Sequence, residues 1–232
     1  MIPIRDTIPS RHVPVATWTL IAVNAVAFFW QLTLPPAAAR DAMFLFGIVP
    51  ARYTNPGWAA EVGFPHSFLP FLTTMFLHSG WLHVIGNMWV LWIFGDNVED
   101  RMGPVRFLVF YLSCGVAAGL IHVATNAGSQ VPAIGASGAI AGVMAAYFVL
   151  YPRSQILTMF PIFFWPIFFH VPAWVYLGFW FLVQFFSGAA TMASGGQAEG
   201  IAFWAHIGGF AFGILTFWAF LRRDRAAPVV PA

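Results

Sequence analysis

Residues 201–221 read IAFWAHIGGFAFGILTFWAFL, a run that contains no Asp, Glu, Lys or Arg. A helix needs about 20 apolar residues to cross the hydrocarbon core of a bilayer, so this stretch predicts a membrane-spanning helix. Five further apolar runs precede it, at residues 15–34, 81–94, 105–123, 134–150 and 173–190. The sequence therefore predicts an all-α, polytopic membrane protein, with six transmembrane helices in one membrane domain covering residues 15–221.

The composition of the 232-residue chain supports a lipid environment. Hydrophobic residues make up 60% of it and charged residues 8%, whereas an ordinary globular domain has about 25% charged residues. The 26 Phe and 11 Trp exceed what one core of this size can bury, so most apolar side chains should face lipid. The net charge of +2 comes from arginines at segment ends, which argues against nucleic acid as a partner.

The arginines also predict the orientation of the chain. If the N-terminus is cytoplasmic, 8 of the 10 basic residues lie inside and only Arg40 and Arg52 lie outside, in agreement with the positive-inside rule. Residues 1–14 and 222–232 are then cytoplasmic tails. The first apolar run has no small-residue cleavage site after it, so we expect it to be retained. The expected location is a cell membrane, specifically the bacterial inner membrane.

Two connections between the predicted spans are unusual. Residues 35–70 form a long, partly charged segment, which we expect to be a folded loop at the membrane interface. Residues 160–172 combine Phe and Trp with three prolines, so we place them at the interface, between the fourth and fifth helices. Cys114 is the only cysteine and lies inside an apolar run, which excludes a disulfide framework and a cysteine-based metal site.

A few polar residues in and beside the spans are candidates for chemistry. They are His78, His83 and Asn87 around the second span, Ser137 in the fourth and His206 in the sixth. Each alone would more often serve packing or an interhelical hydrogen bond. Together they could supply a nucleophilic hydroxyl, a base and oxyanion donors, which peptide hydrolysis requires. His83 and Asn87 are four residues apart, so they share one helix face.

Small residues flank the two candidate reacting groups. Around Ser137 the fourth segment has Gly138, Ala141, Gly142 and Ala145, and after His206 the sixth has Gly209 and Gly213. Small residues at spacings of three and four allow two helices to pack closely, so the hydroxyl could reach the imidazole. No Asp or Glu occurs within the spans near the histidines. The sequence therefore predicts a dyad and not a triad.

Three motifs resemble the signature motifs of the rhomboid intramembrane serine proteases. They are HSGWLHVIGN at residues 78–87, GASG at residues 135–138 and AHIGGFAFG at residues 205–213. Residues 95–103, GDNVEDRMG, are similar to the turn that follows the second helix in that family. The motifs occur in the family's order and on the expected helices, and the resemblance extends from about residue 66 to residue 221.

The resemblance implies the chemistry of the site. Ser137 would be the nucleophile and His206 its general base and then acid. His83, Asn87 and the Ser137 backbone N–H would form the oxyanion hole. Neither a metal nor a cofactor is expected. Supporting roles fall to His78, Gly135, Gly138 and Gly209.

The resemblance also implies partners and access. Substrates would be transmembrane segments of other membrane proteins, cleaved near the outer face in a site open to external water. The fifth helix and the nearby loop would admit these substrates from lipid. The sequence carries no signal for an oligomeric state.

Two positions depart from the pattern of the family. Many members have a Trp-Arg pair where this chain has Leu69 and Pro70, so the first loop must be anchored differently. Some members have a Tyr that stacks on the catalytic imidazole where this chain has Ala141. The group that orients His206 is therefore left open.

Three alternative functions compete with the protease. A catalytically inactive rhomboid-like adaptor would bind membrane-protein clients, but its mark would be loss of Ser137 or His206, and both are present. A haem or metal protein could use His78, His83 and His206, although there is no HExxH motif or paired carboxylate. A channel or transporter would usually have a charged residue at the midplane or repeated halves, and neither occurs.

Overall fold

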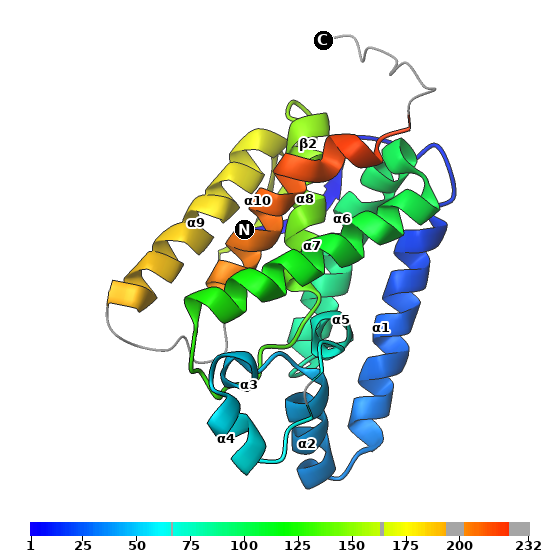
Figure 1. The fold of residues 1–232 in the computed structure, drawn as a ribbon. Coiled ribbons are helices and arrows are strands. Elements are labelled where there is room, and N and C mark those ends of the chain that lie inside the picture. Colours follow the sequence, from blue (N-terminus) through cyan, green and yellow to red (C-terminus); the bar gives the residue numbers. More distant parts are fainter. Residues whose placement is uncertain (66, 163–164, 194–201, 223–232) are drawn as a thin grey trace.

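The computed structural model describes residues 1–65, 67–162, 165–193 and 202–222, and these are mostly helical (Figure 1). Four helices in this part of the chain are long and apolar enough to cross a membrane. They are α1 (Val15–Thr33), α7 (Pro104–Thr125), α9 (Ala173–Ala193) and α10 (Phe203–Phe220). Two further helices accompany them, α6 (Trp81–Met102) and the shorter, apolar α8 (Ser137–Leu150). The prediction of a multi-pass membrane protein is confirmed.

The second helix is longer than its apolar run. The prediction ended it at residue 94, but α6 continues for two further turns through Asp96, Asn97 and Glu99. The Glu99 carboxylate accepts hydrogen bonds from the backbone N–H groups of Ala16 and Thr17, at 2.9 and 2.8 Å. These N–H groups belong to the first turn of α1, where no intrahelical partner exists, so the carboxylate caps that helix.

The centre of the bundle is α8. All ten residues from Gly138 to Tyr147 are buried, which includes every face of the helix. In Figure 1, α9 lies at one side of the bundle and α1 at the opposite side, with α8 between them. A helix that is apolar all round is stable either in lipid or enclosed by other protein elements. Here α6, α7 and α10 enclose it.

The connection before α6 is folded, as predicted. It contains α2 (Pro36–Phe46), α3 (Pro50–Thr54), α4 (Pro56–Glu61), α5 (Pro70–Thr73) and the 3₁₀ helix η1 (Thr74–Phe76). Proline starts each of the four α-helices, where its missing N–H costs nothing. Arg52 is buried and donates to the carbonyl oxygens of Phe44 and Leu45, and its guanidinium lies 4.4 Å from the ring centre of Phe64. Arg52 of α3 therefore ties the end of α2 and the segment at Phe64 together.

The expectation of an all-α fold is wrong in one respect, because three strands form a small antiparallel sheet. β1 (Ile2–Asp6) pairs with β2 (Gln155–Ile162), which pairs with β3 (Trp165–Pro172). Residues 160–172 were expected to be an interfacial connection between the fourth and fifth helices, and residues 1–14 to be a tail. The prolines exclude a helix but are compatible with short strands at a sheet edge.

Side chains from the C-terminal end of α8 and from α6 hold β1 in place. Asp6 Oδ2 accepts hydrogen bonds from the Tyr147 hydroxyl and from Asn97 Nδ2. Trp89 Nε1 donates to the carbonyl oxygen of Pro3 at 2.6 Å. Burial raises the pKa of Asp6 above its ordinary value, because the carboxylate loses water as the strand packs. The first residues are therefore part of the folded unit.

Candidate active site

Ser137 is the first residue of α8 and follows a sharp turn. Gly135 has φ +125°, a conformation that residues with a Cβ rarely adopt. Its N–H donates to the Thr74 carbonyl oxygen at 2.9 Å, and Thr74 Oγ1 donates to the Ala133 carbonyl oxygen at 2.6 Å. The N-cap residue of α8 is Ala136, whose side chain cannot accept a hydrogen bond. It therefore does not cap the first N–H groups of α8.

His206 lies in the first turn of α10 and faces Ser137. Its Nε2 is 2.7 Å from Ser137 Oγ, a hydrogen-bond distance. The structure therefore brings together the two residues that the motifs single out, which lie on different helices and 69 positions apart in the sequence.

Glycine allows this approach of α8 and α10. A Cβ on Gly213 would lie 2.6 Å from the Gly142 carbonyl oxygen, and one on Gly209 would overlap the carbonyl of Gly138. A Cβ on Gly138 would lie 2.6 Å from the Cβ of Ala118 on α7. Because the obstacles at Gly209 and Gly213 are backbone atoms, the two helices would have to separate to accept a side chain there.

His83 and Asn87 converge on the turn before Ser137. A Cβ at Gly135 would lie 2.6 Å from His83 Nε2 and 3.6 Å from Asn87 Nδ2, so a side chain there would displace the His83 ring. His83 Nδ1 is 3.0 Å from Ser79 Oγ, which leaves Nε2 directed at the turn. Asn87 is buried, and its Nδ2 has no hydrogen-bond partner among the described residues. A buried donor without a partner is costly, so a functional reason is expected for it.

His78 lies behind this pair. Its ring meets that of His83 edge-on, with the ring centres 5.0 Å apart, and its backbone N–H and C=O bond the side chain of Gln31 on α1. Burial lowers the pKa of His78 to about 4, so the imidazole is neutral at physiological pH. Its position favours a supporting role.

Sequence reasoning missed two residues of α9 that contact His206. Gln184 Oε1 is 2.7 Å from His206 Nδ1, and the ring of Trp180 lies against the imidazole, with the ring centres 5.9 Å apart. The two are four residues apart, so they share a helix face. A glutamine within a long apolar helix is a signal that could have found this contact, because such groups are costly in lipid.

The engagement of the His206 ring bears on the metal alternative. One ring nitrogen lies beside Ser137 and the other beside Gln184, so neither is directed at an open site. Within residues 1–65, 67–162, 165–193 and 202–222, no three His, Cys, Asp or Glu side chains gather as a metal site would require. The geometry thus favours proton transfer over metal ligation.

These features define a class, a helical membrane protein with a serine and a histidine in contact inside the bundle. The rhomboid domain model matches residues 65–223, and the chain belongs to the rhomboid family. The mouse presenilin-associated rhomboid-like protein, mitochondrial, is 32% identical over 150 residues, which are 62% of this chain and 35% of that protein.

Two further relatives come from yeast and a bacterium. Rhomboid protein 1, mitochondrial, of Saccharomyces cerevisiae is 29% identical over 159 residues, 66% of this chain and 42% of the relative. Rhomboid protease GluP of Bacillus subtilis is 32% identical over 146 residues, 62% of this chain and 26% of the relative. The chain therefore spans from about a quarter to about two fifths of the length of these relatives. One of them is a protease by name.

Proposed function

We propose that the protein is an intramembrane serine endopeptidase that cleaves transmembrane segments of other membrane proteins. The observation that carries the proposal is the 2.7 Å separation of Ser137 Oγ and His206 Nε2, next to a buried amide donor on α6. Membership of the rhomboid family and the likeness to a bacterial rhomboid protease support it.

The proposed reaction uses Ser137 and His206 in two stages. His206 Nε2 takes the hydroxyl proton as Ser137 Oγ attacks the scissile carbonyl carbon, and it then gives that proton to the leaving amine. Water, deprotonated by the same nitrogen, cleaves the resulting ester and restores the serine. No metal or cofactor takes part.

The oxyanion is proposed to bind between α6 and the start of α8. Asn87 Nδ2 and His83 Nε2 approach the turn at Gly135 from one side, and the Ser137 N–H belongs to the first turn of α8. A helix N-terminus favours negative charge, and an amide donor stabilises an oxyanion without carrying a charge into lipid. The unpaired state of Asn87 Nδ2 supports this role, since an oxyanion would supply its missing acceptor.

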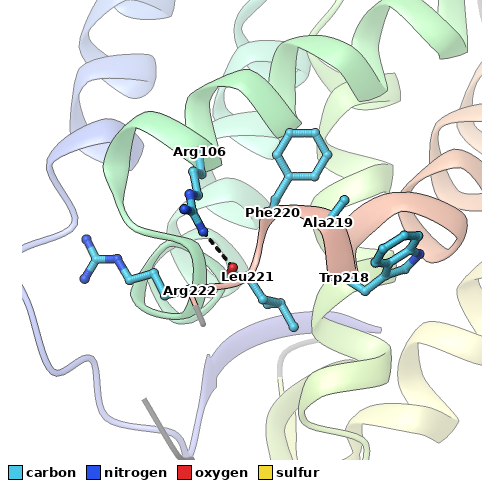
Figure 2. Close-up of a pocket in the computed structure, with 6 residues that line it drawn as sticks. All are labelled: Arg106, Trp218, Ala219, Phe220, Leu221 and Arg222. Carbon is cyan, nitrogen blue, oxygen red and sulfur yellow. Dashed lines mark hydrogen bonds between the residues drawn. The ribbon is translucent and has the colours of Figure 1, made fainter. Parts of the chain in front are cut away.

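We further propose six membrane crossings, with α6 and α8 added to the four helices that qualify by length and apolarity alone. One end of the bundle gathers the start of α1, the end of α6, the start of α7 and the end of α10. Figure 2 shows Arg106 of α7 at this end, donating to the carbonyl oxygen of Leu221. Because Arg101, Arg106 and Arg222 collect there, the positive-inside rule favours this end as cytoplasmic.

The orientation places the dyad toward the outer face. His206 is the fourth residue of α10 and Phe220 its last, so about 21 Å of helix separates it from the arginine-rich end. Substrate would enter from lipid beside α9. The proposed location is a bacterial inner membrane. Cysteine labelling in intact cells, in a Cys114→Ala background, should modify the exposed position 61 of the outer loop and spare position 225, and the reverse pattern would overturn the orientation.

Labelling with a fluorophosphonate tests the chemistry. The purified protein in detergent should form an adduct at Ser137, located by peptide mass spectrometry, and cleave a single-span substrate. Ser137→Ala and His206→Ala should abolish both, and the two losses should not add, because nucleophile and base act as a unit. Binding of the substrate without any adduct or cleavage would favour the inactive adaptor instead.

A further inference from the structure

The imidazole of His206 is held from both sides. Ser137 on α8 lies at Nε2 and Gln184 on α9 lies at Nδ1, each at 2.7 Å. Trp180, one turn before Gln184, covers part of the ring. Among the described residues, these hydrogen bonds to the ring come from two helices that pack on α10 from different directions.

The chemistry of the base fixes which protons these contacts require. To take the proton of Ser137, Nε2 must present its lone pair, so in the neutral ring the hydrogen resides on Nδ1. A hydrogen on Nδ1 needs an acceptor, and the carbonyl oxygen of the Gln184 amide provides one. If the amide were turned round, its NH₂ would donate to Nδ1, and the ring proton would move to Nε2. That tautomer cannot accept a proton from the serine.

We propose that Gln184 is the positioning residue of the dyad, which selects the reactive tautomer of His206 and fixes the direction of its ring. This inference rests on the proposed function. It answers the question that Ala141 raises, since the orienting group comes from the fifth helix instead of from the turn after the nucleophile. As the imidazole becomes protonated, the Gln184 carbonyl dipole also stabilises the charge on Nδ1–H.

The location of Gln184 adds a consequence. Only four of the 21 residues of α9 are buried, namely Ala173, Tyr176, Leu177 and Gly188. The helix that completes the base is thus among the less enclosed helices of the bundle. A displacement of α9 away from α10 would remove the hydrogen bond and the Trp180 contact together. The reactivity of Ser137 should therefore depend on whether α9 is seated.

Two near-isosteric variants separate hydrogen bonding from packing. Gln184→Met keeps the length of the side chain but removes the acceptor, and Gln184→Glu keeps the oxygen. We expect Gln184→Met to lower kcat by roughly 10²-fold, the lower end of what general base catalysis contributes, with KM almost unchanged. Fluorophosphonate labelling of Ser137 should slow in parallel. Val183→Met, at an exposed neighbour on α9, is the matched control and should behave as wild type.

Gln184→Glu should rescue activity and change the pH profile. Its carboxylate accepts from Nδ1–H and favours the protonated imidazole, so the acid limb of kcat/KM should move to higher pH. Full activity of Gln184→Met would overturn the inference, as would equal losses in both variants without a change in the pH profile. Ser137→Ala, measured alongside, separates the two ideas. If it still cleaves, the proposed function fails, and if it is inactive while Gln184→Met is not, only the role of Gln184 fails.

Discussion

Helices α8 and α9 both contribute to the candidate site but differ in how they are held. Every residue of α8 from Gly138 to Tyr147 is buried, whereas α9 buries four of its residues. In our proposals the nucleophile belongs to α8 and the acceptor for the base to α9. The enclosed helix thus fixes the atom that must attack, while the peripheral helix holds a contact that can be made or lost.

The difference follows from the side chains. Between residues 138 and 147, α8 is mostly Gly, Ala and Val with three larger residues, which lets three helices approach it closely. In α9 large aromatic side chains point outward, among them Trp174, Phe179 and Phe186, each more than half exposed. Such a surface suits lipid and leaves little to pack against protein. Burial on all sides makes a helix hard to move, because dense interiors do not deform gradually.

The largest expected effect is on the side of the site formed by α6 and the start of α8. Asn87→Ala should lower kcat by roughly 10²- to 10³-fold with little change in KM, since an oxyanion donor acts mainly in the transition state. His83→Ala should also be impaired, and the double variant should fall further. Steady-state kinetics on a single-span substrate measures this.

The control for Asn87 is another buried asparagine of a spanning helix. Asn24→Ala removes an amide that only bonds the Leu20 carbonyl oxygen within α1, so kcat should remain close to wild type. A raised KM at unchanged kcat in Asn87→Ala would instead mean that this amide binds substrate uniformly.

The next prediction concerns the mobility of α9. A Cβ at Gly188 would lie 3.3 Å from the Cβ of Phe203, close to the separation in a disulfide. Gly188→Cys with Phe203→Cys, in a Cys114→Ala background, should tie α9 to α10 when oxidised. Cleavage of a transmembrane substrate should then fall sharply, because entry from lipid beside α9 is blocked, and reduction should restore it.

Fluorophosphonate labelling distinguishes a blocked entrance from a damaged site. The tied protein should still label at Ser137, because α9 stays seated against His206. Loss of labelling in the oxidised form, regained on reduction, would show that the bond distorts the dyad. Unchanged cleavage in that form would mean that substrates do not need α9 to move.

A smaller effect should separate two glycine-to-alanine changes. Gly209→Ala sets a methyl group against the carbonyl of Gly138, and overpacking of this kind costs about 1–3 kcal/mol. Gly178→Ala on α9 meets only Phe148, at 3.9 Å, and should be neutral or stabilising by up to about 1 kcal/mol. Unfolding in detergent measures both. Equal free energies of unfolding for Gly209→Ala and Gly178→Ala would contradict the difference in packing between the contact of α8 with α10 and the surface of α9.

The smallest expected effect lies at the far end of α8, where Asp6 meets Tyr147. Since burial raises the pKa of Asp6, the folded state binds this proton more tightly than the unfolded state. The protonated Asp6 therefore adds to the free energy of unfolding. This stabilisation is complete below pH 3.8 and is lost as the pH rises through the raised pKa of Asp6, and stability does not change further with this group at higher pH. Asp6→Asn should remove this decline in the thermal unfolding temperature, whereas Asp41→Asn, at an exposed carboxylate of α2, should leave it.

The sequence predicts the parts of this molecule that depend on local pattern. Apolar runs predict where the long helices lie, because each apolar residue lowers the free energy of transfer into lipid almost independently of its neighbours. The glycines beside Ser137 and His206 mark the contact of α8 with α10, since a side chain at Gly209 would strike a neighbouring backbone.

Other features depend on three-dimensional packing that no pattern encodes. The contact of Gln184 with His206 and the approach of Asn87 to the turn at Gly135 become visible only when the rotation of α9 and α6 is known. Asp96 to Glu99 look like a loop by polarity, yet they continue α6 because Glu99 caps another helix. The pairing of β1 with β2 was missed because a five-residue strand carries almost no periodic signal.

The pairing of β1 with β2 has a consequence for biosynthesis. Ile2 pairs with Met159, so the first strand leaves the ribosome about 150 residues before its partner. At roughly 5–20 residues per second, translation takes on the order of 8 to 30 s to supply that partner. During this interval α1, α6, α7 and α8 are made while the strand has no partner strand. Closure of the sheet is thus a late assembly event that joins the beginning of the chain to its second half.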